Sequence, residues 1–474
     1  MGIPWFPMLI SASIIRFFCA VLLFSGLVVQ VGCKALQQRM AWSKSALEAN
    51  KSKTNILGQD EIDAFFAKTS FKMHPYLTSD FQKKLDQETN SELSSHNVLE
   101  LLLNKHSLQK KLELISSAKH SIYITTFHII CDEGGKDFVK ALIAAAQKGI
   151  DVRFLTTGGP WQWWYSGQCL NDMANAHIKV AQTPYSMITS KGVVNLHDKI
   201  LVVDGQYAIV GGQNIGSWFF ETDGHDRKFR DSDVFVEGPV VNTIAKRFIS
   251  LWRTVHAQDA GIDAYQTLIE NKEKEDENKK WRGEKNYSQW LKSESPKGLC
   301  RFVSQNPDKN TYYVFNAYQL YASAAKLRIA FQTPQLNITS DDRQRALWDA
   351  LAGVAAKPNG RVLMITNGPG FVDSEMAPYG TGTLVGYYLL SGLYDSAVGD
   401  KRIEIFAYRS WIHSKVYYFD GLAVGIGSFN LDESGTVWTE NTLICIDPSL
   451  LKQTTEMFKN DFYYSVRLEQ PMAK

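Results

Sequence analysis

Two segments of this 474-residue chain share the pattern His-x-Lys-x-x-x-x-Asp. On a β-strand, side chains two residues apart lie on the same face, so the histidine and the lysine of each segment are expected to project together. Imidazole can act as a nucleophile and as an acid or base near neutral pH, and a lysine can hold negative charge on an oxygen. This combination suits attack on a phosphate ester. The residues are His197, Lys199 and Asp204 in the first segment and His413, Lys415 and Asp420 in the second.

Two copies of the motif supply what one copy lacks. Cleavage of a phosphodiester without a metal requires a nucleophile, an acid that protonates the leaving alkoxide, and positive charge on the phosphate oxygens. A histidine nucleophile can form a covalent intermediate, which divides one difficult displacement into two easier steps. One histidine cannot fill both roles at once. The duplication therefore suggests one shared site at the interface between two halves of the chain. We expect neither a metal ion nor another cofactor in it.

Each motif is followed by a glycine-containing turn that ends in asparagine, at Asn214 and at Asn430. We expect the side-chain amides of both to bind phosphate oxygens, and the alternative is that they are turn formers. Asp204 and Asp420 lie five residues after their lysines, an odd offset that places them on the opposite strand face. Although they complete the two motifs, they are expected to pin the turn by hydrogen bonds rather than to contact substrate.

A histidine nucleophile also needs a carboxylate that orients its ring through the other nitrogen. Asp231 lies eight residues before Pro239 and Glu440 lies eight residues before Pro448, and each begins a short apolar strand. These equivalent positions predict that Asp231 and Glu440 buttress the two histidines. Asp233 is a competing choice in the first half.

The motifs lie within a longer internal repeat. Residues 118–126 align with residues 325–333, and in both cases the end of a helix runs into a strand. A helical pattern and a buried strand follow in each half before the motif is reached. Strands that alternate with helices favour an α/β layered sheet in each half.

A stretch rich in Lys, Glu, Asp and Asn over residues 271–286 separates the two repeats. It indicates either an exposed connector or the charged face of a helix. The expected organisation is an N-terminal signal or anchor at 1–33, an extension without chemical signature at 34–95, a first half at 96–262, a charged connector at 263–298 and a second half at 299–474.

The composition describes a globular protein with room for two domains. Hydrophobic residues make up 45% and charged residues 21% of the chain, and the net charge is +2. A nearly neutral chain has no strong field that would attract nucleic acid. The six cysteines do not have metal-ligand spacing. The four beyond residue 33 either form disulfides in an oxidising compartment or are buried free thiols.

The N-terminal segment has the features of an export signal or a membrane anchor. An apolar run over residues 17–29 follows Arg16, and Gly32-Cys33 resembles a bacterial lipoprotein cleavage site. If the segment is retained, residues 7–31 are long enough to span a bilayer. A buried N-terminal helix is the alternative. We expect an exported or membrane-associated protein, in a bacterial cell envelope or secreted.

The paired motifs and their surroundings resemble the phospholipase D superfamily over about residues 95–465. Within it, the segments 196–199, 211–216, 230–241 and 427–440 look like those of bacterial cardiolipin synthases. The resemblance implies two similar α/β sandwich halves related by pseudo-twofold symmetry, the phospholipase D fold, and a phosphohistidine intermediate. It also implies that His197 is the nucleophile and His413 the acid and base, with Lys199, Lys415, Asn214 and Asn430 at the phosphate.

Two departures leave the subclass open. Cardiolipin synthases often have Pro-Arg where this chain has Asp432-Glu433, and many have two N-terminal membrane helices where this chain has one apolar segment. Hydrolysis and phosphatidyl transfer differ only in whether water or an alcohol reaches the phosphohistidine.

The expected function is that of a phospholipase D-type enzyme on phospholipid at a membrane surface, with water or an alcohol as acceptor and no nucleic acid partner. A nuclease or another phosphodiesterase on the same scaffold is the alternative. A degenerate scaffold that only binds anionic lipid is a third reading, which the intact motifs in both halves disfavour.

An aromatic cluster follows the strand that ends near residue 157. It either holds acyl chains or a bilayer interface, or forms a packed cover over the core. Two lone histidines, His128 and His225, have no motif partners and are expected to have ordinary surface or core roles. The cluster comprises Trp161, Trp163, Trp164 and Tyr165.

Overall fold

The computed structural model describes most of the chain beyond its N-terminal segment. The described residues are 57–67, 73–185, 195–220, 230–293, 297–336, 341–368, 393–394, 397, 400, 402–432 and 434–468. The expected signal or anchor at 1–33, the extension up to residue 56, His225, and the side chains of Trp161, Trp163 and Trp164 lie outside this described part.

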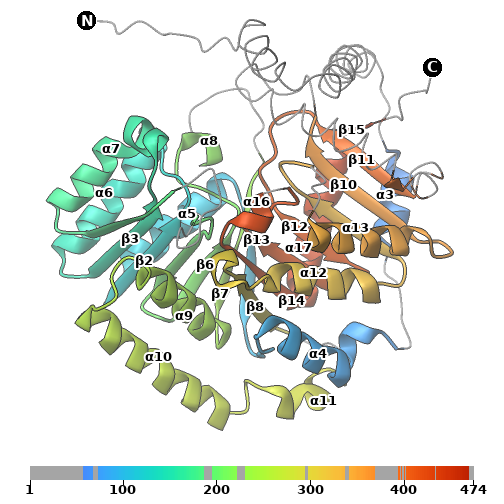
Figure 1. The fold of residues 1–474 in the computed structure, drawn as a ribbon, viewed down its shortest axis with the longest axis horizontal. Coiled ribbons are helices and arrows are strands. Elements are labelled where there is room, and N and C mark those ends of the chain that lie inside the picture. Colours follow the sequence, from blue (N-terminus) through green and yellow to red (C-terminus); the bar gives the residue numbers. More distant parts are fainter. Residues whose placement is uncertain are drawn as a thin grey trace, which may run out of the picture. The chain divides into compact units, whose positions relative to one another are not determined.

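The first half, coloured blue to green in Figure 1, is built around a seven-stranded mixed sheet in the order β1-β7-β6-β5-β2-β3-β4. Strands β2, β3 and β4 pair in parallel, and the other pairs are antiparallel. The strand β5, which follows the first motif histidine, therefore lies inside the sheet. The strands are β1 (Val98–Leu103), β2 (Ser121–Thr126), β3 (Asp151–Thr157), β4 (Lys179–Thr183), β5 (Ile200–Val203), β6 (Tyr207–Gly211) and β7 (Ser232–Glu237).

The second half repeats this order in an eight-stranded sheet, β15-β11-β10-β9-β12-β13-β14-β8. Read from β8 to β11, each strand has a counterpart in the first sheet, and β15 is an addition at the edge. The same order in both sheets confirms the predicted pair of α/β halves. The strands are β8 (Leu299–Gln305), β9 (Arg328–Gln332), β10 (Arg361–Asn367), β11 (Ile403–Tyr408), β12 (Val416–Phe419), β13 (Ala423–Gly427), β14 (Glu440–Ile446) and β15 (Ser465–Arg467).

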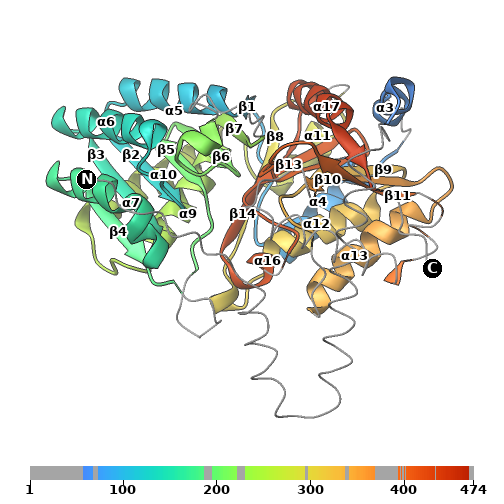
Figure 2. The ribbon, with the colours of Figure 1, turned by 90° about the horizontal axis from the view of Figure 1, so that it is seen from above.

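Helices bury the apolar faces of both sheets and create successive layers. The helices α5 (Lys105–Ser117) and α6 (Glu133–Gln147) share one core with the outer face of the first sheet, and α12 (Tyr313–Ala324) and α13 (Asp342–Ala355) do the same for the second. A third core lies between the sheets and contains α9 (Val240–Trp252) and α17 (Pro448–Tyr463). Figure 2 shows the two halves side by side, with β14 at their boundary.

Short polar side chains determine where several of these helices begin. Asp132 accepts a hydrogen bond from the backbone N–H of Gly135 at 2.9 Å and thereby caps α6. The same carboxylate accepts one from the backbone N–H of Ser217 at 2.8 Å, at the start of α8 (Ser217–Phe220). One aspartate therefore joins the loop after β2 to α8. Further helices are α7 (Pro160–Asn175) and α16 (Ser434–Val437).

The segments before and between the halves are folded onto them. In the extension, Tyr76 donates a hydrogen bond to the backbone oxygen of Tyr321 at 2.7 Å. Residues 271–278 of the charged stretch form the mostly exposed last turns of a helix, whose apolar side is buried by Ile262, Tyr265 and Ile269. Residues 279–286 lie beyond the end of that helix, so the stretch contains both a helix face and part of the segment that connects the halves. The elements are α3 (Gln59–Phe66), η1 (Pro75–Leu77), α4 (Ser79–Thr89), α10 (Ala260–Asn278), η2 (Glu284–Asn286), α11 (Tyr287–Trp290) and η3 (Pro307–Lys309).

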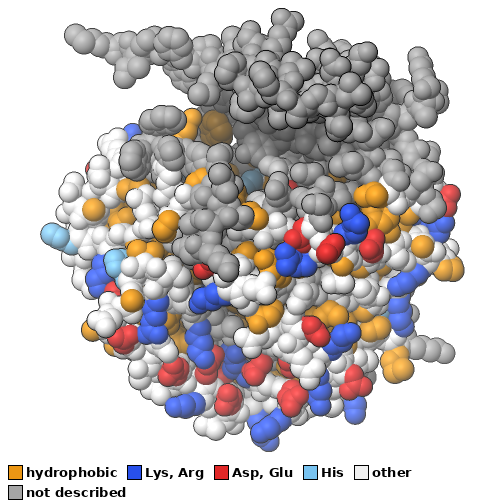
Figure 3. Space-filling model, in the orientation of Figure 1, with side chains coloured by type: hydrophobic (Ala, Val, Ile, Leu, Met, Phe, Trp, Pro, Cys, Tyr) orange, Lys and Arg blue, Asp and Glu red, His pale blue; other side chains and the backbone are white. Residues whose placement is uncertain are grey.

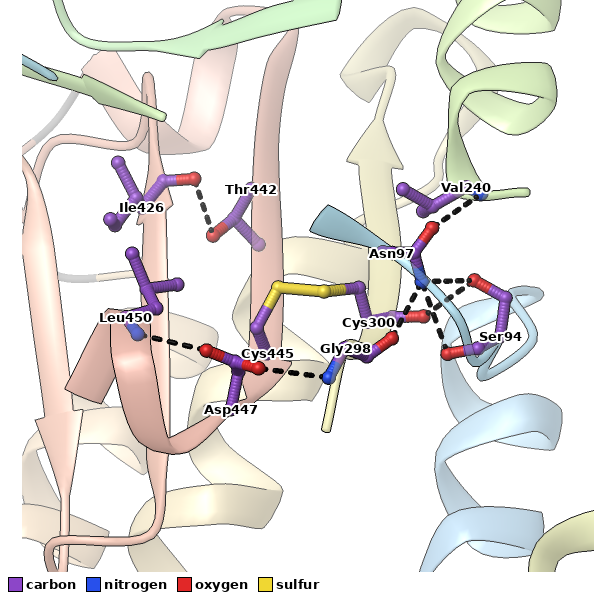
Figure 4. The surroundings of a disulfide bond; sticks show 10 residues. All are labelled: Ser94, Asn97, Val240, Gly298, Cys300, Ile426, Thr442, Cys445, Asp447 and Leu450. Atoms are coloured by element: carbon purple, nitrogen blue, oxygen red, sulfur yellow. Dashed lines mark hydrogen bonds between the residues drawn. A yellow bond between two sulfur atoms is a disulfide. The ribbon is translucent and has the colours of Figure 1, made fainter. Parts of the chain in front are cut away.

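The four cysteines beyond residue 33 form two disulfides. Cys131 is bonded to Cys169 on α7, which ties that helix to the loop after β2. Cys300 is bonded to Cys445 between the directly paired strands β8 and β14. Figure 4 shows the second bridge beside the Asn97 side chain, whose amide donates to the Gly298 backbone oxygen at 2.7 Å. Of the two alternatives left open by the sequence, the structure has the disulfides.

Basic and acidic side chains are mixed on the face of the molecule seen in Figure 3, where both signs alternate along the lower edge. This pattern matches the nearly neutral net charge of +2. Within the described residues, every helix is too short or too polar to cross a membrane.

Candidate active site

The histidine of the first motif is oriented by a carboxylate of the second half. His197 exposes 2% of its surface, and its Nδ1 atom lies 2.8 Å from Oε1 of Glu440. Leu196 pairs with Thr439 in an isolated β-bridge, and the backbone N–H of His197 donates to Oγ1 of Thr439 at 3.1 Å. The residue before the histidine is thus paired with the residue before the carboxylate, which brings the two side chains together.

The histidine of the second motif is oriented by a carboxylate of the first half. The Nδ1 atom of His413 lies 2.9 Å from Oδ2 of Asp231. Arg230 pairs with Ile412 in the matching β-bridge, and the backbone N–H of His413 donates to the oxygen of Arg230 at 2.8 Å. The two halves therefore exchange carboxylates crosswise, and each histidine depends on the opposite half.

Glycine at one turn permits this close approach. A Cβ atom on Gly212 would lie 2.8 Å from Oδ1 of Asp231, 3.1 Å from Cδ of Lys415 and 3.2 Å from the backbone oxygen of His413. Any side chain at this position would push the second motif away from its carboxylate. The glycine-containing turn seen in the sequence is therefore explained by contact between the halves.

The two lysines are buried beside their histidines. The Nζ atom of Lys199 donates to the backbone oxygen of His197 at 2.7 Å, and Lys415 makes the equivalent bond to His413. Burial and the charge of Lys415 lower the pKa of Lys199 to about 7. Burial lowers the pKa of Lys415 to about 8, against the opposing effect of Asp231. The two ammonium groups are therefore close enough to interact electrostatically, and both lose a proton at lower pH than an exposed lysine does.

Burial also shifts the pKa values of the two histidines and of Glu440. Burial and the charges of Lys199 and Lys415 hold the pKa of His197 well below its ordinary value, and burial raises the pKa of Glu440 well above its own. Burial and Lys415 lower the pKa of His413 to about 4. The free site therefore favours neutral histidines, the form in which Nε2 can act as a nucleophile.

The two asparagines have equivalent positions and the same unpaired atom. Asn214 follows β6 and Asn430 follows β13, and both side chains are buried. Among the described residues, Oδ1 of each finds no hydrogen-bond partner. A buried polar atom without a partner is unfavourable unless a ligand supplies one. These oxygens are acceptors, whereas a phosphate oxygen needs an N–H donor, and Nδ2 of Asn430 already donates to Oγ of Ser434 at 3.3 Å. Binding of phosphate by the two amides therefore stays a prediction.

Asp204 and Asp420 are placed at the far ends of the motif strands and bind backbone rather than the site. Asp204 accepts hydrogen bonds from the backbone N–H groups of His120 and Ser121, both at 2.8 Å. Asp420 accepts one from Arg328 at 2.8 Å in the equivalent turn, and His74 adds a side-chain contact at 2.8 Å. These bonds match the turn-pinning role expected for the two aspartates.

Asp233, the competing buttress, is engaged elsewhere. Its Oδ2 atom accepts from Nζ of Lys111 at 2.8 Å and from the hydroxyl of Ser107 at 2.5 Å. Its Oδ1 atom accepts from the backbone N–H of Gln213 at 3.1 Å. The structure therefore gives the buttressing position to Asp231.

Several residues at the site were missed by sequence reasoning. Asp198, between the motif histidine and lysine, accepts two bonds of 2.9 Å from the guanidinium of Arg247 on α9. Phe127 and Trp438 pack on the ring of His197. Trp438 lies two residues before Glu440, so its nearness to the motif carboxylate was the available signal.

His128 has a less ordinary setting than the sequence suggests. It follows Phe127 and is half-buried, and burial together with the charge of Lys199 lowers its pKa to about 4. It therefore lies near the site as a neutral group. Within the described part of the chain, no cluster of three His, Cys, Asp or Glu side chains could hold a metal ion.

Comparison with known proteins identifies related sequences and a matching family model. A family model described as cardiolipin synthase, PLD-like domain, matches residues 112–252 and 321–462. A cardiolipin synthase of Clostridium perfringens (strain 13 / Type A) is 24% identical over 418 residues, which cover 83% of this chain and 77% of that protein. A cardiolipin synthase of Alkalihalophilus pseudofirmus is 25% identical over 399 residues, which cover 82% of this chain and 70% of that protein.

A solved structure confirms the fold. The crystal structure of phosphatidylserine synthase from Haemophilus influenzae Rd KW20 superposes with a TM-score of 0.57 at 14% identity, and the match covers 82% of this chain and 92% of that one. The two segments matched by the family model make up more than half of the sequence, and each contains one histidine–lysine motif. The chain therefore belongs to the cardiolipin synthase, PLD-like domain family.

Proposed function

We propose that this protein is a phospholipase D-type phosphodiesterase and phosphatidyltransferase, which cleaves or transfers phospholipid head groups through a phosphohistidine. The observation that carries the proposal is the crosswise pairing of His197 with Glu440 and of His413 with Asp231. Relatives that are cardiolipin synthases support a phospholipid as the substrate. Because phospholipids assemble into bilayers, we place the reaction at a membrane surface.

In the first step, Nε2 of His197 attacks phosphorus and the bond from phosphorus to the head-group oxygen breaks. His413, protonated at Nε2, gives its proton to the leaving oxygen. The low pKa of His413 in the free site rises when an anionic phosphate binds beside it, because a nearby negative charge favours the protonated ring. The phosphatidyl group is then held covalently on His197.

In the second step, His413 takes a proton from water or from an alcohol. The oxygen of that acceptor attacks phosphorus, and the phosphorus–nitrogen bond breaks to return the electron pair to His197. Water yields phosphatidic acid, whereas an alcohol yields a new phospholipid. The charges on Lys199 and Lys415 stabilise the phosphate oxygens in both steps.

A side-by-side assay tests the proposal. The full chain is incubated with labelled phosphatidylglycerol, with and without added glycerol, and separately with single-stranded DNA. Lipid mass spectrometry should show loss of phosphatidylglycerol, with transfer products that increase with the alcohol. Cleavage of DNA without turnover of lipid would identify a nuclease on this scaffold instead.

We also propose that the protein is exported or membrane-associated and works in an oxidising compartment. The bridges Cys131–Cys169 and Cys300–Cys445 support this location, because disulfides persist there and are rare in reducing cytosol. Thiol labelling of protein isolated from its native host should leave all four of these cysteines unmodified until a reductant is added. Labelling of all four without reductant contradicts the location.

A further inference from the structure

Aromatic side chains pack against the ring of His197. The ring of Phe127 lies edge-on to the imidazole with the centroids 5.2 Å apart, and the ring of Trp438 lies 5.0 Å from it. Phe127 and Trp438 are stacked on each other at 5.0 Å. Tyr185 extends the group, with its ring 6.4 Å from that of Trp438. We call Phe127, Tyr185 and Trp438 the aromatic ledge.

The ledge is held by the same contacts that hold the nucleophile. Phe127 directly follows β2 in the first half, whereas Trp438 follows α16 in the second. The backbone N–H of Thr439, next to Trp438, donates to the oxygen of Asn195 at 2.9 Å, and its hydroxyl accepts from the N–H of His197. The indole is therefore fixed relative to the imidazole by two bonds that cross between the halves.

The exposure of the ledge differs from that of a packed core. His197 exposes only 2% of its surface, whereas all three ledge side chains are half-buried. Apolar rings that remain partly open beside a fully buried nucleophile form a surface on which an incoming molecule can rest. The charged end of that molecule would reach Lys199, whose Nζ lies 5.6 Å from the centre of the Phe127 ring.

The order of bond making determines which part of the substrate lies against this surface. In the proposed reaction, the group that stays on phosphorus after the first step is covalently attached to His197, and the group that leaves departs toward His413. The retained group of a phospholipid is its diacylglycerol part. An apolar surface beside His197 therefore faces the apolar part of the lipid, not the head group.

We propose that the aromatic ledge binds the acyl chains of the donor lipid along the row of rings from Phe127 through Trp438 to Tyr185, and so makes the site selective for long-chain diacyl substrates. This inference rests on the proposed function. It assigns Phe127 and Trp438 as specificity-determining residues. Contact with an apolar ring is worth more to a long acyl chain than to a short one, because more methylene surface leaves water.

The test compares one head group on two acyl lengths. The kcat/KM of the full-length protein is measured on dioleoyl phosphatidylglycerol in mixed micelles and on monomeric dihexanoyl phosphatidylglycerol. Trp438→Ala should lower the ratio of the two kcat/KM values about tenfold, mainly through KM for the dioleoyl lipid. Trp438→Phe should retain most of the ratio because a ring is kept.

A matched variant controls for the loss of an indole. Trp281 stacks on His96 at 5.1 Å on a different part of the molecule, and Trp281→Ala should leave the ratio unchanged. If Trp438→Ala does not fold, Phe127→Leu should lower the ratio in the same direction. An unchanged ratio in a folded ledge variant, or an equal loss on both lipids, overturns the inference.

The activity of the wild-type protein shows whether the proposed function or only the inference about the aromatic ledge has failed. If the wild-type protein cleaves neither lipid, the function and the inference fall together. If the wild-type protein cleaves both lipids and the ledge variants show no change in selectivity, only the inference falls.

Discussion

Nδ1 of His197 and Oε1 of Glu440 are 2.8 Å apart, although 243 residues separate them in the sequence. His413 and Asp231 form the reciprocal pair at 2.9 Å. An imidazole that is held in one orientation by a carboxylate presents its other nitrogen to the reacting atom. Both reactive nitrogens are therefore oriented from the opposite half.

Removal of either histidine should abolish turnover and leave the fold intact. We expect His197→Ala and His413→Ala each to lower kcat by on the order of 10⁴-fold or more, since each supplies a separate chemical role. Turnover of labelled phosphatidylglycerol measures the loss, and circular dichroism checks the fold. Full activity in either folded variant contradicts the mechanism.

Substitutions at Asp231 and Asp233 should distinguish a residue that orients a catalytic histidine from one that stabilises the fold. Asp231→Asn removes the charge behind His413 and should lower kcat about a hundredfold or more with little change in the melting temperature. Asp233→Asn removes the negative charge that is paired with the buried ammonium of Lys111 at 2.8 Å, so it should destabilise the fold while the remaining folded protein keeps its kcat. The opposite pattern would show that Asp233 is the buttress.

The buried charge of Lys199 should make stability depend on pH. Its pKa is lowered to about 7 in the folded protein, from an ordinary value of 10.5. Below pH 7 the lysine is charged in both states and the folded state carries the whole penalty of burial. Between about pH 7 and 10.5 only the unfolded chain keeps the proton, so this unfavourable contribution shrinks as pH rises.

Replacement of Lys199 tests whether its contribution to stability changes with pH in this direction. Lys199→Met should abolish turnover and raise the melting temperature at pH 6, and the gain should become smaller toward pH 10. The control is Lys140→Met on α6, because the Lys140 side chain is 75% exposed and should show no such trend. A gain that grows with pH would contradict the assignment of a buried, charged Lys199.

The two disulfides should differ in their effect on activity. Loss of either bridge is expected to destabilise the fold by about 2–5 kcal/mol. Cys131 lies in the loop that begins with Phe127, which packs on His197, so Cys131→Ser with Cys169→Ser should also lower kcat. Cys300→Ser with Cys445→Ser affects a strand pair that has its own ladder of hydrogen bonds and should lower only the melting temperature. Equal kcat in both double variants would exclude a role of the first bridge at the site.

Much of the fold and the site could be predicted because the signals are local and occur twice. The alternation of strands and helices, the shared face of histidine and lysine, and the odd offset of Asp204 all follow from residue spacing. Duplication also identified Asp231 and Glu440, since each lies eight residues before a proline. The buttressing positions that the structure shows for both carboxylates are therefore visible in the sequence.

Features that depend on contact between distant segments could not be predicted. The crosswise exchange arises from the bridges Leu196–Thr439 and Arg230–Ile412, and no periodicity encodes such a pairing. The choice between thiols and disulfides depended on the register that sets Cys300 opposite Cys445. The position of Trp438 on His197 likewise requires the second half to be placed against the first.

The exchange of carboxylates bears on the origin of the chain. In a protein with a single copy of this unit, the carboxylate could not orient the histidine of the same copy. Such a protein would form a complete catalytic site only when two molecules associated. Fusion into one polypeptide makes that encounter intramolecular and therefore independent of protein concentration. It also makes each copy depend on the other, because a mutation that removes the carboxylate from one copy leaves the histidine of the other copy without its orienting partner.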